Sequence, residues 1–467
     1  MRIGRILLLF SLLFSNVLAA QEGFVYIDEI SIEGNRRTQS DVVFRELRFH
    51  KGDSIPLSQL SKTLEESEQL IMNTGLFQRA DITFKNWEGS SSKVHIHIAV
   101  EETWYIYPVP ILELVDRNFN VWWVEQQRSL DRINFGIEFT HLNFTGHRDK
   151  FKLTAKYGYT RSYSMKYNLP AINKAKTIGI NTEIDFARNR ETNYATIGNK
   201  QEFYKDPDRF LYQRFNTVFG LSYRPGHHLF HRLRLAYRQY AIDNLIVEEF
   251  NPNFFGDSKN LSRFFALEYS FLYDRRDARP YPLKGSYLEV KLNKDGIGIF
   301  NDRNSLTLWA DFARYFSPTP KFSFSVSPKF KLSLIRDKQP FIDYRAIGFG
   351  RNNLHGFEYY IVDGLDMALL KTVVRYRLIS TELSFGKWVP IKAFRRMPIR
   401  MYMTLNNDVG IANDPYFGDV NPLNRQLLWG GGPGLDFVFY YDKVLRVEFS
   451  MNHLGEKGLF LHFNTNI

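Results

Sequence analysis

Apolar and polar residues alternate almost without a break between Lys321 and Arg336, and this alternation constrains the fold more than any other feature of the chain. One parity carries Phe322, Phe324, Val326, Phe330, Leu332 and Leu334, and the other carries Ser323, Ser325, Ser327, Lys329, Lys331 and Ser333. Successive side chains of a β-strand point to opposite faces, so this segment is predicted to have one apolar and one polar face. Similar two-residue periods recur to the C-terminus. They indicate a β-barrel that exposes its apolar face to lipid and its polar face to water.

The first 20 residues have the features of a secretory signal peptide. Arg2 and Arg5 precede an apolar run from Ile6 to Phe14, and Ala19 and Ala20 supply small residues just before the expected cleavage site. The run is shorter than the roughly 20 residues that a membrane-spanning helix needs, which argues against a membrane anchor. The residue after the expected cleavage site is not a cysteine, so we expect no lipoprotein anchor there.

Composition narrows the class of protein further. No long apolar stretch follows the signal peptide, which argues against a helical membrane protein. The aromatic share of 16% is high, with 41 Phe and 26 Tyr, and such residues suit β-strands and the aromatic girdles of barrels. The absence of cysteine excludes disulfides and thiol chemistry. The net charge of +11 is spread along the alternating segments, so we assign it to the barrel lumen and to contacts with anionic lipid rather than to nucleic acid.

Residues 25–102 differ from the rest and are predicted to form a small α+β domain. The expected order is β-α-α-β-β, with two helices packed on a three-stranded sheet. The first helix is expected to be capped by Thr38 or Ser40 and to end at Leu47. The second helix is indicated by apolar residues at helical spacing, which are Leu57, Leu60, Leu64 and Ile71. The last two strands are expected near residues 77–84 and 94–100.

Residues 103–467 are predicted to form an antiparallel transmembrane β-barrel of about 16 strands, so the fold class is mainly β. The expected strands are 104–114, 132–145, 148–159, 160–170, 176–188, 212–224, 229–244, 262–275, 285–295, 304–315, 321–335, 367–378, 398–408, 430–439, 443–453 and 459–467. Turns after even-numbered strands are short and several connections after odd-numbered strands are long, which is typical of the two rims of such a barrel. The link 379–397 is the main exception, because it is long on the short-turn rim. A soluble β-sandwich is the alternative, but it would need several domains, and no linkers separate the strands.

Catalytic and metal-binding motifs are weak. His227, His228 and His231 crowd a predicted turn, and His95 and His97 share a strand face on which we expect no acidic partners. The chain has no nucleophile elbow, no phosphate-binding glycine loop and no H-E-x-x-H motif. We therefore expect no enzyme, no cofactor and no metal site.

Two groups of motifs resemble a known family. Residues 30–47 are similar to the start of a POTRA domain, and residues 73–77 are similar to its TGLF turn. The matching positions are Gly34, Asn35, Thr38, Gly75 and Phe77. A predicted periplasmic turn of the barrel is similar to the family's D-x-R-D…P-x-x-G motif, with Asp274, Arg276, Asp277, Pro282 and Gly285 at the matching positions. Over nearly all of its mature length, the chain therefore resembles the BamA-type outer-membrane insertase superfamily, with a single POTRA domain.

The resemblance implies a long loop, residues 336–366, that folds back into the barrel. The family's loop tip carries Arg-Gly-Tyr/Phe, and the matching residues here are His355, Gly356 and Phe357, so a histidine replaces the arginine. The resemblance implies that this position reaches an acidic residue on a late strand, for which Asp408 is the natural match. Histidine is shorter and only partly charged near neutral pH, so a His355–Asp408 contact is expected to be weaker or pH-dependent. Arg351 is an alternative partner, and a loop that serves only as a plug is the other interpretation.

The resemblance also implies a function. It predicts an outer-membrane protein assembly factor whose periplasmic POTRA domain captures unfolded clients at an exposed sheet edge. A weak seam between the strands at residues 104–114 and 459–467 would help to insert β-barrel proteins, and Pro108 and Pro110 remove ladder donors there. Unfolded outer-membrane proteins and outer-membrane lipids are the implied partners, and accessory periplasmic or lipoprotein partners stay open. A secretion or lipid-export pore of the same fold and a passive porin-like channel are the alternative functions.

Overall fold

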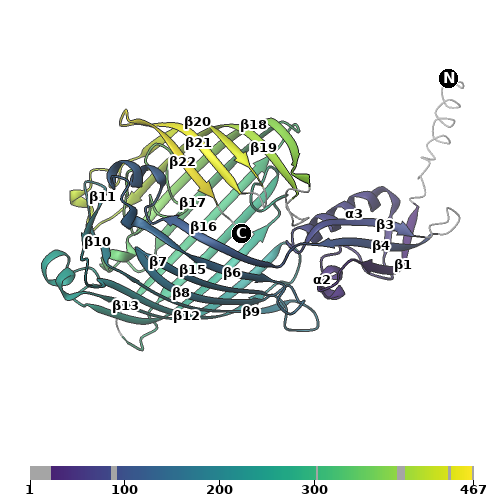
Figure 1. Cartoon of the computed structure of the whole chain (residues 1–467), viewed down its shortest axis with the longest axis horizontal. Coiled ribbons are helices and arrows are strands. Elements are labelled where there is room, and N and C mark those ends of the chain that lie inside the picture. The colour runs from purple at the N-terminus through teal and green to yellow at the C-terminus, as the bar shows by residue number, and fades with distance from the viewer. Residues whose placement is uncertain (1–22, 86–91, 301–302, 387–394, 440–442, 465–467) are drawn as a thin grey trace, which may run out of the picture. The chain divides into compact units, whose positions relative to one another are not determined.

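The computed structural model describes residues 23–85, 92–300, 303–386, 395–439 and 443–464. The chain separates into two compact units, Met1–Thr103 and Trp104–Ile467 (Figure 1). The predicted signal peptide, residues 1–20, lies outside the described residues. Within the described ranges, none of the helices combines the length and the apolar character that crossing a membrane requires.

The first unit is a four-stranded sheet with two helices. Its elements are β1 (Phe24–Glu33), α2 (Ser40–Phe44), β2 (Ser54–Pro56), α3 (Leu57–Met72), β3 (Phe77–Lys85) and β4 (Lys93–Glu102). The strand order is β2-β1-β4-β3, in which β1 and β4 are parallel and the other pairs are antiparallel. The predicted β-α-α-β-β elements are present. Strand β2 adds a fourth strand to the three expected, and its three residues are too few to show a periodic pattern.

Helix α3 follows its predicted apolar spacing, whereas the side-chain cap predicted for α2 is wrong. Three of the four predicted apolar positions of α3 are buried, namely Leu60, Leu64 and Ile71. Helix α2 spans five residues and ends at Phe44, before the predicted end at Leu47, and its N-cap is Gln39 without a side-chain cap hydrogen bond. The Ser40 hydroxyl instead accepts a hydrogen bond from Asn35 Nδ2 at 3.1 Å.

The second unit is dominated by one antiparallel sheet of 16 strands, as predicted. Its strands are β5 (Ile106–Leu114), β6 (Ile133–Leu142), β7 (Lys150–Gly158), β8 (Thr160–Leu169), β9 (Ile178–Asn189), β12 (Tyr212–Tyr223), β13 (Leu229–Ile242), β14 (Leu261–Asp274), β15 (Gly285–Asp295), β16 (Ser305–Phe316), β17 (Phe322–Ser333), β18 (Asp366–Ser384), β19 (Arg396–Asn413), β20 (Leu428–Val438), β21 (Val444–Asn452) and β22 (Lys457–Asn464). Each strand pairs with the next in this order. Figure 1 shows the sheet curling round, with β6–β8 in front of β15–β17.

A separate hairpin stands outside this sheet. It consists of β10 (Glu191–Ile197) and β11 (Lys200–Lys205), which form a two-stranded sheet of their own within the described part of the chain. The sequence pattern predicts only a loop over residues 189–211, so the hairpin is a departure from it. Its strands carry many polar side chains and show no regular apolar alternation, so the period-two signal is absent.

Strand β17 is apolar on its outer face and polar on its inner face, as the alternation predicts. Phe330 and Leu332 are 51% and 44% exposed, whereas the intervening Lys331 is 5% exposed. The Lys331 ammonium donates to the carbonyl oxygen of Gly364 at 2.8 Å, so a loop inside the sheet receives this buried charge. An outward apolar face and a satisfied inward charge are what a membrane-embedded barrel requires.

The prediction of a long link at residues 379–397 is wrong in its extent. Strand β18 continues to Ser384 and β19 begins at Arg396, and the two remain in register with Thr381 opposite Ile399. The predicted strands are too short because a register irregularity between Arg377 and Ile379 breaks the alternation.

Helical structure in the described part of the second unit consists of short segments. These include η1 (Val121–Glu125), η2 (Leu130–Arg132), η3 (Ile246–Phe250), η4 (Phe341–Asp343) and η7 (Gly418–Val420). They lie in connections between strands, which agrees with the prediction of a barrel built from strands.

An apolar core lies where the loop between β17 and β18 packs against the inner face of the sheet. The loop supplies Ala346, Ile347, Leu354, Phe357 and Val362, and the sheet supplies Met367, Leu369, Ala412 and Leu428. The loop is therefore a packed part of the fold, and its tip is fixed against late strands.

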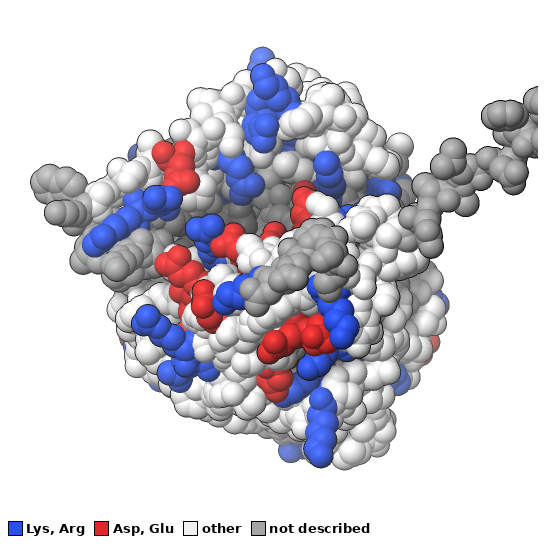
Figure 2. All heavy atoms as spheres, turned by 90° about the vertical axis from the view of Figure 1, so that its right-hand side faces the viewer, with Lys and Arg blue, Asp and Glu red and all other residues white. Residues whose placement is uncertain are grey.

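Charge on the surface is mixed in sign. Figure 2 shows basic and acidic side chains interleaved on the face that it presents, without one dominant basic patch. This distribution fits a net charge of +11 that is spread along the chain, as the sequence suggests.

Candidate functional site

The loop between β17 and β18 carries the predicted motif into the interior of the barrel. Leu354 and Phe357 are 0% and 2% exposed, and His355 between them is 6% exposed. Gly356 has a positive φ of 83°, and a Cβ there would lie 2.6 Å from the carbonyl oxygen of Met451. Glycine is required here both for the backbone conformation and for the close approach to β21.

His355 is the centre of a buried charge network. Its Nδ1 lies 2.6 Å from Asp408 Oδ2 on β19, and its Nε2 lies 3.2 Å from Glu448 Oε2 on β21. The backbone N–H of His355 also donates to Asp408 Oδ2 at 3.2 Å. The structure therefore brings His355 and Asp408 together and adds a second carboxylate, which the sequence analysis did not identify.

Both ring nitrogens of His355 face carboxylates, so both must carry protons to donate, and the ring is an imidazolium. Burial lowers the pKa of His355, but Asp408 and Glu448 outweigh it and raise the pKa to about 9. The site thus differs from the expectation of a partly charged histidine near neutral pH. The imidazolium places a positive charge at the position where the resemblance predicts an arginine.

Lys371 is the second cation at Asp408. Its Nζ lies 3.4 Å from Asp408 Oδ2, and the two residues are direct partners in the β18–β19 register. Arg351, the predicted alternative, is exposed and lines a polar cavity of about 780 Å³. Among the described residues, no ion pair joins Arg351 to Asp408.

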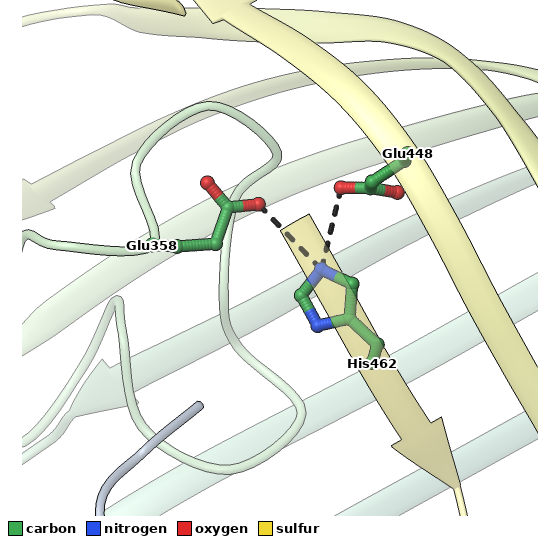
Figure 3. Close-up of side chains that lie close together, drawn as sticks. All are labelled: Glu358, Glu448 and His462. Carbon is green, nitrogen blue, oxygen red and sulfur yellow. Dashed lines mark hydrogen bonds and ion pairs between the residues drawn. The ribbon is translucent and has the colours of Figure 1, made fainter. Parts of the chain in front are cut away.

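A second cluster extends this network to the last strand. Glu358 of the loop, Glu448 of β21 and His462 of β22 form the carboxylate–histidine cluster, which Figure 3 shows converging from three elements. His462 Nε2 lies 3.3 Å from Glu448 Oε1 and 3.8 Å from Glu358 Oε1. Sequence reasoning missed these three residues, because they come from segments far apart in the chain and share no spacing.

No strand ladder joins the two ends of the sheet among the residues that the structure describes. The sheet order runs from β22 to β5, and no pairing joins these two strands within the described residues. Asn120, in the connection after β5, occupies the edge of β22 instead. Its Nδ2 donates to the carbonyl oxygen of Leu459 at 2.6 Å, and its Oδ1 accepts the Leu461 N–H at 3.3 Å. We call the edges of β5 and β22 the seam.

The same connection also holds the inward loop. Arg117 donates to the carbonyl oxygens of Tyr360 at 2.9 Å and Tyr359 at 3.2 Å. Asn118 Nδ2 donates to the carbonyl oxygen of Glu358 at 2.8 Å. Three residues of the segment 117–120, which are Arg117, Asn118 and Asn120, therefore link the loop to the seam. Sequence reasoning missed this link too, because nothing in the residues 117–120 signals a partner more than two hundred positions away.

The predicted periplasmic turn between β14 and β15 is closed by its own charges. Arg276 makes two 2.8 Å hydrogen bonds to the carboxylate of Asp274, and Asp277 accepts from the Leu283 N–H at 3.0 Å. Gly285 has a φ of 104°, and a Cβ there would lie 2.0 Å from a backbone oxygen. Pro282 is half-buried in the same turn.

This turn places a side chain that the sequence analysis did not single out. Tyr281 is 5% exposed, and its hydroxyl donates to Asp436 Oδ2 on β20 at 2.9 Å. Arg446 of β21 makes two hydrogen bonds to the same carboxylate, at 2.7 and 2.9 Å. The turn motif thus has a structural consequence, which is to anchor the turn to the late strands.

The predicted POTRA residues lie at the turns of the first unit. Gly34 has a φ of 91°, and a Cβ there would lie 1.8 Å from the Val100 carbonyl oxygen. The Thr38 N–H donates to Glu102 Oε1 at 2.7 Å, and Asn35 Nδ2 donates to the Thr38 carbonyl oxygen at 2.9 Å. Gly75 also has a positive φ, of 74°, and Phe77 after it is buried.

The expectation that His95 and His97 lack acidic partners is wrong. His95 Nδ1 lies 3.7 Å from Glu29 Oε2, and His97 Nε2 lies 3.2 Å from Glu33 Oε1. The parallel pairing of β1 with β4 creates these contacts, and sequence alone does not reveal that register. His231 at the other predicted turn contacts the Tyr269 hydroxyl at 2.8 Å.

Comparison with known proteins agrees with this architecture. Residues 25–103 match the family model described as POTRA, surface antigen variable number repeat, and residues 143–363 match the Omp85 superfamily domain. A β-barrel of this type, preceded by one POTRA domain, defines an outer-membrane protein. The chain therefore carries a POTRA domain followed by an Omp85 superfamily domain.

Solved structures share the fold at low sequence identity. BamA from Haemophilus ducreyi lacking POTRA domains 1–3 is 14% identical with a TM-score of 0.52, and the match covers 94% of this chain and 83% of that one. CdiB from Escherichia coli is 9% identical with a TM-score of 0.58, covering 94% and 75%. CdiB from Acinetobacter baumannii is 13% identical with a TM-score of 0.52, covering 94% and 73%. Among curated proteins, none matches the chain.

Proposed function

We propose that this protein is an outer-membrane assembly factor that inserts β-barrel proteins, with the seam as the place where a client strand pairs. The observation that carries the proposal is the absence of a ladder between β5 and β22 in the described residues. A chain entering hydrocarbon must pair its backbone groups. A strand edge offers such pairing without reading the client's sequence.

The contacts that hold the seam are suited to replacement. Asn120 contributes two hydrogen bonds to β22, each worth about 1 kcal/mol net, whereas a full strand pair makes many more. Pro108 and Pro110 lie in β5 and lack the N–H groups that a ladder needs. A client strand can therefore displace the Asn120 side chain and gain backbone partners on β22.

The POTRA domain is proposed to lie in the periplasm and to present unfolded clients. Strand β3 is at one end of its sheet, so one edge of β3 is available for strand addition. Glu68 of α3 accepts the Ile82 N–H of this strand at 2.7 Å. A client must displace this side chain or pair to either side of it.

The test is a disulfide across the seam. The chain has no cysteine, so N120C with L459C introduces a single defined pair. The matched control is L235C with L267C, which are opposite one another in the existing β13–β14 ladder. Both proteins are assayed for insertion of an unfolded barrel client into vesicles of outer-membrane lipid. We expect the oxidised seam variant to lose insertion and to recover it on reduction, while the control stays active. Full activity of the locked seam would exclude the mechanism.

A secretion pore is the second candidate, favoured by the structural likeness to CdiB and by the polar lumen. The cavity of about 780 Å³ is lined by charged side chains that include Arg232, Glu268, Lys291 and Asp311. Depletion of the protein separates the two functions. A fall in many outer-membrane proteins supports assembly, and loss of one exported cargo supports secretion. A passive porin would instead give large, steady conductance in planar bilayers.

A further inference from the structure

We propose that the carboxylate–histidine cluster, formed by Glu358, Glu448 and His462, binds a divalent transition-metal ion of the Zn²⁺ class. Such an ion would join the inward loop and β21 to the last strand (Figure 3). The binding itself does not depend on the proposed insertase function. Only its consequence for the seam does, since β22 forms one side of the seam.

The geometry of the cluster suits a small ion. One donor atom from each residue lies within 4.8 Å of the other two. The distances from His462 Nε2 to the two carboxylates are 3.3 Å and 3.8 Å. Tetrahedral zinc with bonds of about 2.0–2.1 Å separates its ligand atoms by about 3.3 Å. Modest side-chain movements would therefore let the three donors share one ion.

The environment of the Glu358 carboxylate points to a missing ligand. The residue is 2% exposed, and neither of its carboxylate oxygens has a hydrogen-bond partner among the described residues. Its nearest cationic group is His462, whose single Nε2 also faces Glu448. One N–H donates well to one acceptor, and both distances exceed those of a strong charge-assisted hydrogen bond. A metal ion would bind both carboxylates and the imidazole together.

The surrounding residues orient the donors toward one point. Asn406 Nδ2 donates to Glu448 Oε2 at 3.3 Å, and His355 faces the same oxygen. Glu448 Oε1 is thereby left facing His462, with the Ser450 hydroxyl 3.1 Å away. Metal ligands in proteins are commonly held by such outer hydrogen bonds.

The donor set selects the class of ion. Imidazole nitrogen with two carboxylate oxygens suits Zn²⁺, and a fourth position is open to water. Calcium and magnesium prefer sets made entirely of oxygen. The alternative to a metal ion in this cluster is a proton on His462, because an imidazolium between two carboxylates also balances charge.

Zinc binding to the full-length protein in detergent tests the proposal. Protein stripped with a chelator is titrated with ZnCl₂ by calorimetry, and bound metal is counted by elemental analysis after desalting. We expect one tight zinc per wild-type chain, and affinity at least tenfold weaker in E358Q and H462A. The matched control is E456Q, which changes an exposed carboxylate that hydrogen-bonds Tyr360 near the cluster. Control protein should bind zinc as the wild type does.

A second measurement uses the wild type alone, so it stands even if a variant fails to fold. X-ray absorption of the zinc-loaded protein should show imidazole nitrogen and carboxylate oxygen at about 2.0–2.2 Å. Absence of tight zinc from the wild type would mean that His462 carries only a proton and would overturn the proposal. Equal binding by E358Q and H462A would place the zinc elsewhere and overturn it too. Zinc binding by a protein that inserts no client would count against the insertase function alone.

Discussion

The side-chain amide of Asn120 lies on the edge of β22 and donates a 2.6 Å hydrogen bond to the carbonyl oxygen of Leu459. The amide oxygen of the same side chain accepts the Leu461 N–H at 3.3 Å. A carboxamide has the donor and acceptor of a peptide group, so one side chain occupies two backbone groups that a neighbouring strand would otherwise pair. The edge of the last strand is thus covered by a single side chain, which can move away by breaking two hydrogen bonds.

Substituting Asn120 should loosen β22 selectively. In N120L both hydrogen bonds are lost, and the cost is roughly 1–2 kcal/mol because each bond is worth about 1 kcal/mol. We expect faster hydrogen exchange at the Leu461 N–H, with unchanged exchange in the β13–β14 ladder. Exchange is measured by mass spectrometry on the protein in detergent.

The control for this experiment is N118A. Asn118 Nδ2 donates to the Glu358 carbonyl oxygen and its Oδ1 accepts the Val121 N–H at 2.9 Å. Neither bond reaches β22, so the loss of this side chain should loosen the inward loop and spare the Leu461 N–H. Equal exchange of that amide in N120L and the wild type would show that Asn120 does not hold the edge.

Removing the charge of Asp408 should destabilise the barrel strongly. In D408N the His355 imidazolium and the Lys371 ammonium lose a buried partner, and breaking a buried ion pair costs roughly 3–5 kcal/mol. The loss is measured by gel electrophoresis of samples heated stepwise, as a lower temperature at which the band changes from folded to unfolded mobility.

D311N is the comparison, because Asp311 pairs with Lys329 at 3.1 Å in a more exposed part of the lumen. It should cost about 1 kcal/mol or less. Similar losses in both variants would contradict a special role for Asp408.

Gly356 should be irreplaceable for two separable reasons. A side chain there meets both a positive φ of 83° and the Met451 carbonyl oxygen. Gly455 has the same φ of 83°, but a Cβ added there would meet no atom of the described residues within 4 Å, so G455A measures the backbone cost alone, about 1–2 kcal/mol. G356A should cost clearly more, because the loop tip must also move away from β21. Equal melting temperatures for the two variants would show that the loop yields freely.

The strands were predictable because their signal is local. In β17 the alternation of Phe330, Lys331 and Leu332 specifies both the element and which face meets lipid, without knowledge of any partner. The same signal fails in β10 and β11, whose strands lack alternation. Family motifs located the loop tip and Asp408, since those residues lie within short recognisable stretches.

The rest of the site depends on register, which no local pattern encodes. Lys371 reaches Asp408 because β18 and β19 pair with these two residues opposite each other. Glu448 and His462 reach Glu358 only after β21 and β22 stand beside the folded loop. The acidic partners of His95 and His97 arise in the same way, from the pairing of β1 with β4.

The turn between β14 and β15 makes a last prediction. Its motif residues bind one another, and Tyr281 connects them to Asp436, a carboxylate that also holds Arg446 in two hydrogen bonds. In Y281F the turn loses a hydrogen bond to a charged acceptor, which is worth roughly 1.5–3 kcal/mol, and the melting temperature should fall accordingly. Y163F is the control, because the Tyr163 hydroxyl bonds that of Tyr157 on the exposed face and its loss should cost about 0.5 kcal/mol or less. If the two variants have the same melting temperature, the turn is anchored by its own salt bridges, and the motif does not act through Tyr281.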